Sequence, residues 1–216
     1  MKNSLSLTIL SLGTLFLLGC NDSSDDESQS NAAVYAGTTQ DEEGNPVEAQ
    51  VIVAPSQNPV LTLWDDRDRQ MNYAGKQINT DSVSFSSVQY ECKLVGEQFN
   101  CEDTMGEFLL NKQQFSSQSL SDYLGAYQAL WDGSLYQISV ASEGLVELTG
   151  NNCSSEGQLN LSEQIDGLVE LNLTQGDCGL DTFHAYGQLM VDNDTLYSLN
   201  VMTTLTSFPN TWVKID

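Results

Sequence analysis

Four cysteines carry the clearest chemical information in this sequence: Cys92, Cys101, Cys153 and Cys178. A metal site built from thiolates needs closely spaced cysteines together with histidine. The chain has no C-x-x-C pair, and its single histidine is His184. In an oxidising compartment an even number of cysteines instead predicts disulfides, and four cysteines allow three connectivities.

The spacing of these cysteines favours the pairs Cys92–Cys101 and Cys153–Cys178. A two-residue turn at Gly96-Glu97 would make a hairpin in which Cys92 and Cys101 lie directly opposite each other, at a separation that suits a disulfide. Cys153 and Cys178 follow the turn-like sequences Gly150-Asn151-Asn152 and Gly176-Asp177. A disulfide between them would join the ends of neighbouring strands and stabilise the fold by about 2–4 kcal/mol.

The fifth cysteine, Cys20, has a different setting. After Lys2, residues Leu5–Leu18 form an apolar stretch that is short for a membrane span and typical of a signal peptide. The stretch leads into Leu17-Leu18-Gly19-Cys20, which resembles the lipobox of bacterial lipoproteins. The resemblance implies that residues 1–19 are removed and that Cys20 carries diacylglycerol and a further acyl chain such as palmitate, so that the mature chain is anchored to a membrane. Asn21, in place of the aspartate typical of inner-membrane retention, favours the outer membrane, facing either the periplasm or the exterior.

Residues 20–31 are expected to form a lipidated flexible tether. The segment Asn21–Asn31 contains no aliphatic or aromatic side chain, so it cannot bury enough surface to offset the entropy lost on ordering. A chain of this length has a root-mean-square reach of roughly 18 Å. The folded part of the protein would therefore stand clear of the lipid headgroups.

The chain is strongly acidic, with 7 Lys and Arg against 30 Asp and Glu and a formal charge of −23. This charge excludes nucleic acid as a partner and excludes electrostatic docking on anionic lipid. No Lys or Arg occurs from Gln113 to Val213, whereas twelve acidic residues do. The acidity has two interpretations: a solvated surface, or a face complementary to a basic protein partner or a divalent cation.

No motif in the sequence identifies a reaction. His184 lies close to Asp181, but a general base also needs a positioned nucleophile. The chain contains no G-x-S-x-G, H-E-x-x-H, P-loop or G-x-G-x-x-G motif. We therefore expect a non-enzymatic protein with no catalytic residues and no cofactor, and we interpret His184 as a surface residue on a strand.

Two further groups have both a binding and a structural interpretation. Clustered aspartates could offer oxygens to calcium, although their spacing does not match an EF-hand; these are Asp65, Asp66 and Asp68, and Asp192 with Asp194. Three aromatic residues beside the Asp132-Gly133 turn could form a ligand platform or pack as cross-strand pairs; these are Tyr127, Trp131 and Tyr136. We favour packing for the aromatic residues and expect no resident metal.

The elements that must position these residues are short β strands. Runs rich in alternating apolar residues are separated by turn sequences such as Asp132-Gly133 and Glu143-Gly144. Short turns require antiparallel pairing. The expected strands include Val47–Val53, Val60–Trp64, Ser82–Cys92, Leu135–Ala141, Leu145–Thr149, Leu168–Thr174, Phe183–Val191 and Leu196–Thr203. The only expected helical turn is Ser119–Leu124.

The sequence thus predicts an all-β protein of antiparallel meanders that form one or two small barrel- or sandwich-like units. The polar linker Ser116–Ser119 separates a first β segment, residues 32–115, from a second, residues 119–216. Both segments open with a Tyr-x-Gly sequence, Tyr35-Ala36-Gly37 and Tyr123-Leu124-Gly125. An internal duplication and the recurrence of a common corner motif both explain this similarity.

The order of these motifs resembles that of a family of uncharacterised proteobacterial lipoproteins. The shared features are the lipobox, the polar tether, a first β segment opening with Tyr-x-Gly, and a second segment in which Cys153, Gly157, Cys178 and Gly187 follow one another. The resemblance implies fold and anchoring, and carries no established activity. The leading functional hypothesis is a membrane-anchored, non-enzymatic binding or envelope-interaction module. The alternative is an inhibitor or immunity-type protein that masks a basic enzyme in the periplasm.

Overall fold

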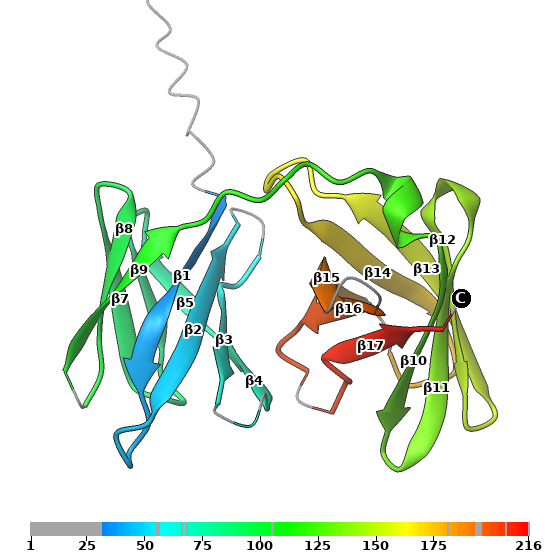
Figure 1. Cartoon of the computed structure of the whole chain (residues 1–216), viewed down its shortest axis with the longest axis horizontal. Helices are drawn as coiled ribbons and strands as arrows, with labels where there is room; N and C mark the ends of the chain where they lie inside the picture. The colour runs from blue at the N-terminus through cyan, green and yellow to red at the C-terminus, as the bar shows by residue number, and fades with distance from the viewer. Residues whose placement is uncertain are drawn as a thin grey trace, which may run out of the picture.

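A computed structural model describes residues 32–216, apart from 55, 56, 66, 68, 105, 181, 193–195, 206 and 216. The expected signal peptide, Cys20 and the tether lie outside the described residues. The chain is all-β, as predicted, and forms two antiparallel barrels joined by a segment without regular structure that precedes a short 3-10 helix (Figure 1). Within the described residues, no helix has the length and apolarity needed to cross a membrane.

The first barrel is a nine-stranded sheet with the order β4-β3-β2-β1-β9-β8-β7-β6-β5. Its strands are β1 (Ala33–Gln40), β2 (Pro46–Val53), β3 (Val60–Trp64), β4 (Gln70–Ala74), β5 (Lys76–Asn79), β6 (Ser82–Phe85), β7 (Tyr90–Val95), β8 (Gln98–Glu102) and β9 (Glu107–Lys112). Strand β1 pairs with both β2 and β9, so the sheet is open only between β4 and β5.

The strand directions show that the nine strands of this sheet occupy eight places in the barrel, because β4 and β5 are two halves of one strand. Every pair, including β1 with β9, is antiparallel. With nine strands this is possible only if β4 and β5 run in the same direction. Gly75 alone separates them, so residues 70–79 form one bent strand that pairs with β3 along its first half and β6 along its second. A Cβ atom at Gly75 would lie 2.5 Å from the buried Phe85 ring, which explains why the bend carries glycine.

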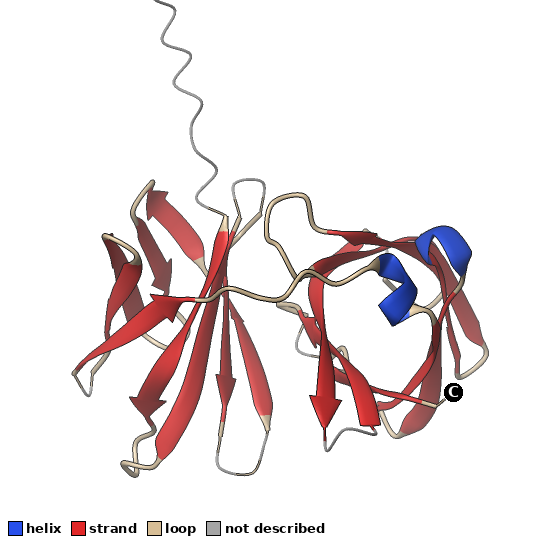
Figure 2. Ribbon diagram, turned by 45° about the horizontal axis from the view of Figure 1, so that its top comes forward, coloured by secondary structure: helices blue, strands red, loops and turns tan. Residues whose placement is uncertain are grey.

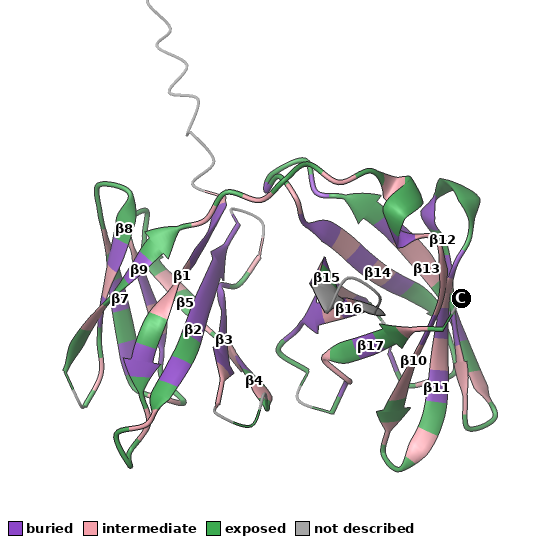
Figure 3. Cartoon of the chain, in the orientation of Figure 1, coloured by how far each residue is buried: buried purple, intermediate pink, exposed green. Residues whose placement is uncertain are grey.

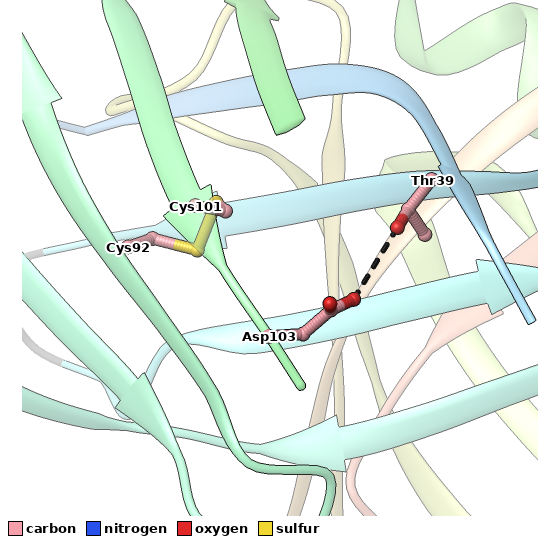
Figure 4. Close-up of a disulfide and its surroundings, with 4 residues drawn as sticks. All are labelled: Thr39, Cys92, Cys101 and Asp103. Atoms are coloured by element: carbon pink, nitrogen blue, oxygen red, sulfur yellow. Dashed lines mark hydrogen bonds between the residues drawn. A yellow bond between two sulfur atoms is a disulfide. The ribbon is translucent and has the colours of Figure 1, made fainter. Parts of the chain in front are cut away.

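The hairpin predicted around Gly96-Glu97 is present. Val95 pairs with Gln98, and Gly96 has a φ of 65°, as a two-residue hairpin turn beginning with glycine requires. Cys92 lies directly opposite Cys101, and the two form a disulfide with a Cα–Cα distance of 3.9 Å. Figure 4 shows this disulfide together with the nearby hydrogen bond that Thr39 donates to Asp103.

The second barrel is closed, because its first strand pairs with its last. Its strands are β10 (Gly125–Trp131), β11 (Ser134–Val140), β12 (Leu145–Gly150), β13 (Cys153–Leu161), β14 (Val169–Gly176), β15 (Phe183–Asp192), β16 (Leu196–Met202) and β17 (Thr211–Lys214). Two 3-10 turns, η1 (Leu120–Tyr123) and η2 (Ser142–Gly144), lie near one end of the barrel (Figure 2). The first of them matches the expected helical turn. Cys153 begins β13 and is bonded to Cys178, which follows β14, as predicted.

One of the predicted strands was wrong. The run Ser82–Cys92 is not one strand, because a turn between Phe85 and Tyr90 divides it into β6 and β7. Gln89 in this turn has a φ of 57°, a conformation that breaks an extended chain. The turn predicted at Glu143-Gly144 is present and has 3-10 geometry, as η2. In it, Glu143 has a φ of 63°, and the Nε2 atom of Gln158 donates a hydrogen bond to its carbonyl oxygen.

Buried residues alternate with exposed ones along the strands (Figure 3), and the buried side chains form one core in each barrel. In the first barrel, Tyr35 and Phe99 meet edge to face with their ring centroids 4.4 Å apart. In the second, Tyr127 and Trp212 are fully buried, and Phe208 from the loop before β17 packs on Trp212. An eight-stranded barrel is just wide enough for such packing, so the outer faces of the barrels are where a functional site must be sought.

Candidate functional site

The outer faces of the two barrels meet in a third, smaller apolar core. We call this cluster the apolar plug. It consists of Val34, Ile52 and Ala54 from the first barrel and Ile165, Leu168, Tyr186 and Met202 from the second. Every member is less than a tenth exposed. The barrels therefore hold each other in place, since separating them would expose this apolar surface to water.

The strand register places a series of side chains beside the plug that become more polar with distance from it. On the first barrel, the row nearest the plug pairs Val34 with Ile52. The next row on the same face places Gln50 beside Thr62, and the row beyond it places Glu48 beside Trp64. Because side chains on one face recur every second residue, the surface changes from apolar to polar along the strands.

The outer face of β15 and β16 forms the opposite wall. Here Tyr186 pairs with Met202 in the plug, and the next row on the same face pairs Gln188 with Asn200. The two walls enclose a cleft of about 820 Å³. We call it the inter-barrel cleft. Its lining includes Glu48, Gln50, Trp64, Gln188, Met190 and Asn200.

A chain of amides crosses from one barrel to the other. Thr62 donates a hydrogen bond to the side-chain oxygen of Asn72 at 2.8 Å, and the Asn72 amide donates to Asn210 at 2.9 Å. Asn210 in turn donates to the backbone oxygen of Gln70. These directional bonds complement the non-directional plug and set the orientation of one barrel relative to the other.

Three buried side-chain polar atoms have no hydrogen-bond partner within the described part of the chain: Gln50 Oε1, Gln70 Oε1 and the Tyr186 hydroxyl. All three belong to the surfaces between the barrels. Gln50 is only 8% exposed and lines the cleft. Burial, followed by the nearby Glu170 carboxylate, raises the pKa of Tyr186, so this phenol keeps its proton and remains a hydrogen-bond donor. Such orphan atoms are uncommon in native interiors.

Trp64 differs from the other two tryptophans of the chain. Trp131 and Trp212 contact Phe208 in the core of the second barrel. Trp64 is partly buried in the lining of the cleft, and its ring contacts no other aromatic ring among the described residues. An aromatic ring in this position presents an apolar surface to whatever enters the cleft.

His184 lies at the contact between the barrels. Its Nε2 atom is 2.8 Å from the Gln57 amide of the first barrel and 3.6 Å from Oε2 of Glu170. The Ser162 hydroxyl donates to the other oxygen of Glu170. The carboxylate thus lies between the serine and the histidine, whereas nucleophilic catalysis requires the imidazole to lie between the hydroxyl and the carboxylate. This group therefore joins the barrels and does not form a triad.

The other candidate groups have structural roles. Asp65 accepts hydrogen bonds from the backbone of Arg67 and Arg69 and pairs with the Arg69 guanidinium, and these bonds lower its pKa. Its neighbours Asp66 and Asp68 lie outside the described residues, as do Asp181, Asp194 and the side chain of Asp192. The packing interpretation of the aromatic residues is confirmed, because Trp131 and Tyr136 pack together with their centroids 4.8 Å apart.

Ligand atoms of Cys153, Asp177 and Cys178 lie within 4.8 Å of one another. The two sulfur atoms are bonded to each other, and Asp177 accepts a hydrogen bond from the backbone of Ser154. A disulfide offers no thiolate to a metal, so this cluster acts as a covalent and hydrogen-bonded link between β13 and β14.

The residues of the cleft carry no motif that sequence reasoning could detect. Gln50, Gln188 and Asn200 are single amides in ordinary strands, and the barrels bring them together over more than a hundred residues of sequence. Gln50 follows Glu48 in the polar phase of the Val47–Val53 alternation, as a solvent-facing residue would, and the departure from that phase is the apolar Ile52. Comparison with protein-family models, with curated proteins and with solved structures finds no match to this chain.

Proposed function

We propose that this protein is a lipid-anchored, non-enzymatic binding module of the bacterial cell envelope, and that the inter-barrel cleft is its binding site. The observation that carries the proposal is the preformed inter-barrel cleft, whose lining includes the amides of Gln50, Gln188 and Asn200. Gln50 also carries one of the three buried polar atoms that have no hydrogen-bond partner among the described residues. Buried polar atoms that the chain leaves unpaired are completed by ordered water or by a ligand. A preformed cleft lined by a few polar groups is the common form of a ligand site.

The proposed anchor is supported by the order of Lys2, Leu5–Leu18 and the lipobox ending at Cys20. Strand β1 enters the first barrel at Ala33, at the end where the apolar plug lies, and contributes Ala36, Gly37 and Thr38 to the cleft lining. Thr38 lies five residues, about 16 Å of strand, beyond Ala33. A tether that leads into Ala33 would thus enter the barrel at the plug end of this lining.

Lipidation is tested by metabolic labelling of cells with an alkyne analogue of palmitate. We expect wild type to be labelled and Cys20→Ala to lose the label completely and to accumulate as an uncleaved precursor, since lipid transfer requires the Cys20 thiol. Ser23→Ala, a substitution of similar size in the tether, should be labelled like wild type. An unlabelled wild type, or a labelled Cys20→Ala, would show that the protein is not a lipoprotein.

A second candidate function, the masking of a basic enzyme, is favoured by the register of the glutamates. Glu147 lies directly opposite Glu156 on β12 and β13. Glu102 lies opposite both Glu91 and Glu107 on neighbouring strands. Like charges placed opposite each other destabilise a sheet, so these opposed glutamates lower the stability of the fold. Long-range attraction would accelerate capture of a cationic protein.

This candidate is tested with the triple substitution Glu143→Gln, Glu147→Gln and Glu156→Gln. We expect stability to be kept or raised by about a few tenths of a kcal/mol, because the opposed pair is relieved. If these glutamates bind a basic enzyme, the triple variant should capture less of it than wild type from periplasmic and secreted fractions at low salt. The control replaces Glu42, Glu97 and Glu163 by Gln, which changes the net charge equally. Recovery of the same partners by all three proteins at low and high salt would exclude masking.

A further inference from the structure

We propose that the inter-barrel cleft binds a short, electrically neutral oligosaccharide. This inference rests on the proposed binding function and specifies the chemical class of the ligand. It follows from four properties of the cleft: the kind of hydrogen-bonding groups that line it, an available aromatic surface, the sign of its charge, and the absence of free strand edges in its walls.

The polar lining contains three amides beside Thr38, Glu48 and Asp65. Gln50 faces the cleft from β2, and the directly paired Gln188 and Asn200 face it from β15 and β16. An amide offers donors and an acceptor on one planar group. A sugar hydroxyl also donates and accepts, so neighbouring hydroxyls on a ring match amides better than ligands that only donate or only accept. The buried Oε1 atom of Gln50 has no hydrogen-bond partner among the described residues.

Trp64 supplies the apolar half of the recognition. Its partly buried ring lines the cleft beside Glu48, with which Trp64 is directly paired. The C–H face of a pyranose ring is apolar and flat, and it stacks on an indole while the ring edge remains free for hydrogen bonds. Met190, 43% exposed on the opposite wall, extends this apolar surface.

Charge excludes the anionic alternatives. The described lining contains the acids Glu48 and Asp65 and no lysine or arginine. Phosphate, sulfate and carboxylate groups are recognised through cationic side chains, and the described lining offers them none. The Glu48 carboxylate can instead accept hydrogen bonds from hydroxyl groups, whereas the Asp65 carboxylate is already occupied by Arg69.

The strands of the cleft walls leave no edge for an extended peptide. Within the first barrel, β2 pairs with both β1 and β3. In the second, β15 pairs with β14 and β16, and β16 also pairs with β17. A peptide that adds to a sheet needs a strand with unpaired backbone groups. Recognition in this cleft must therefore use side chains, and a volume of about 820 Å³ is in the range of small-molecule sites.

Direct binding is tested by calorimetry on the full lipidated protein in a detergent without a sugar headgroup. The probes are maltotetraose, cellotetraose and chitotetraose, with tetragalacturonate as the anionic comparison. We expect at least one neutral probe to bind and the anionic one not to bind. Trp64→Ala and Gln50→Leu should each weaken binding at least tenfold, and Trp64→Phe should have an intermediate effect. The controls Leu135→Ala and Gln175→Leu, on exposed sites outside the cleft, should bind like wild type. Thermal unfolding confirms that each variant is folded.

Binding by none of the three neutral probes, or equal binding by wild type and Trp64→Ala, would overturn the proposal. A second experiment separates this failure from failure of the binding function. A photoreactive amino acid is placed at Met190, and cells are illuminated. An adduct that stains for glycan supports the proposal. An adduct with a protein leaves the binding function standing and overturns the sugar as ligand. Absence of any adduct at Met190 overturns both.

Discussion

Gly157→Ala is expected to destabilise the second barrel by about 3 kcal/mol or more, at the upper end of what overpacking usually costs. Gly157 lies where the register between β13 and β14 shifts, at a β-bulge. A Cβ atom there would lie 1.9 Å from the backbone oxygen of Asn172 and 2.9 Å from the Cα of Leu173. Backbone atoms cannot rotate away as a side chain can, so the two strands would have to separate.

The matched control is Gly133→Ala in the β10–β11 turn. Gly133 has a φ of 74°, and a Cβ atom there would have no neighbour within 4 Å. Alanine at this position bears only the strain of a left-handed backbone, about 1–2 kcal/mol. Urea unfolding of both variants, followed by circular dichroism, measures the two costs separately. If Gly157→Ala were no less stable than Gly133→Ala, the close approach of β13 and β14 at the bulge would be wrong.

Ile52→Ala is expected to lower the free energy of unfolding by about 2–5 kcal/mol, as for other large-to-small substitutions in cores. Ile52 is 1% exposed, and its contacts in the apolar plug are made with residues of both barrels. We expect wild type to unfold in a single cooperative transition because the plug couples the barrels. In the variant the transition should broaden or split, since each barrel retains its own core.

The control for this prediction is Ile78→Ala on β5 of the same barrel. Ile78 is 59% exposed, so its truncation should change stability by less than about 0.5 kcal/mol. Differential scanning calorimetry measures both the midpoint and the shape of the transition. A single unshifted transition in Ile52→Ala would show that the plug does not couple the barrels, and the orientation of the cleft walls would then need another cause.

The local features of this fold could be predicted from the sequence because their causes are local. The turn at Gly96-Glu97 sets the register of its hairpin, and this register places Cys92 opposite Cys101. Period-two alternation identified strands such as Val47–Val53 and Leu145–Thr149. The run Ser82–Cys92 has strand-like residues on both sides of a turn. Its β-propensity could not show that Gln89 adopts a left-handed conformation and interrupts the strand.

The closure of the barrels could not be predicted, because it depends on pairings between distant segments. No local pattern states that β1 pairs with β9 or that β10 pairs with β17. Only the directions of the paired strands show that β4 and β5 are the two halves of one strand, bent at Gly75, which completes a ring of eight strands. The two segments thus share a meander topology, which agrees with the similarity of their opening sequences.

By itself, the sequence determined the all-β class, the antiparallel meanders, the division at Ser116–Ser119 and the pairing of the four described cysteines, since each follows from side-chain period, turn chemistry or spacing within a short stretch. The tertiary structure alone decided the candidate site. Gln50, Trp64, Gln188 and Asn200 have no sequence signal in common. They meet because the apolar plug and the amide chain through Asn72 and Asn210 hold two outer faces together, and contacts between the surfaces of two folded barrels leave no periodicity in the chain that makes them.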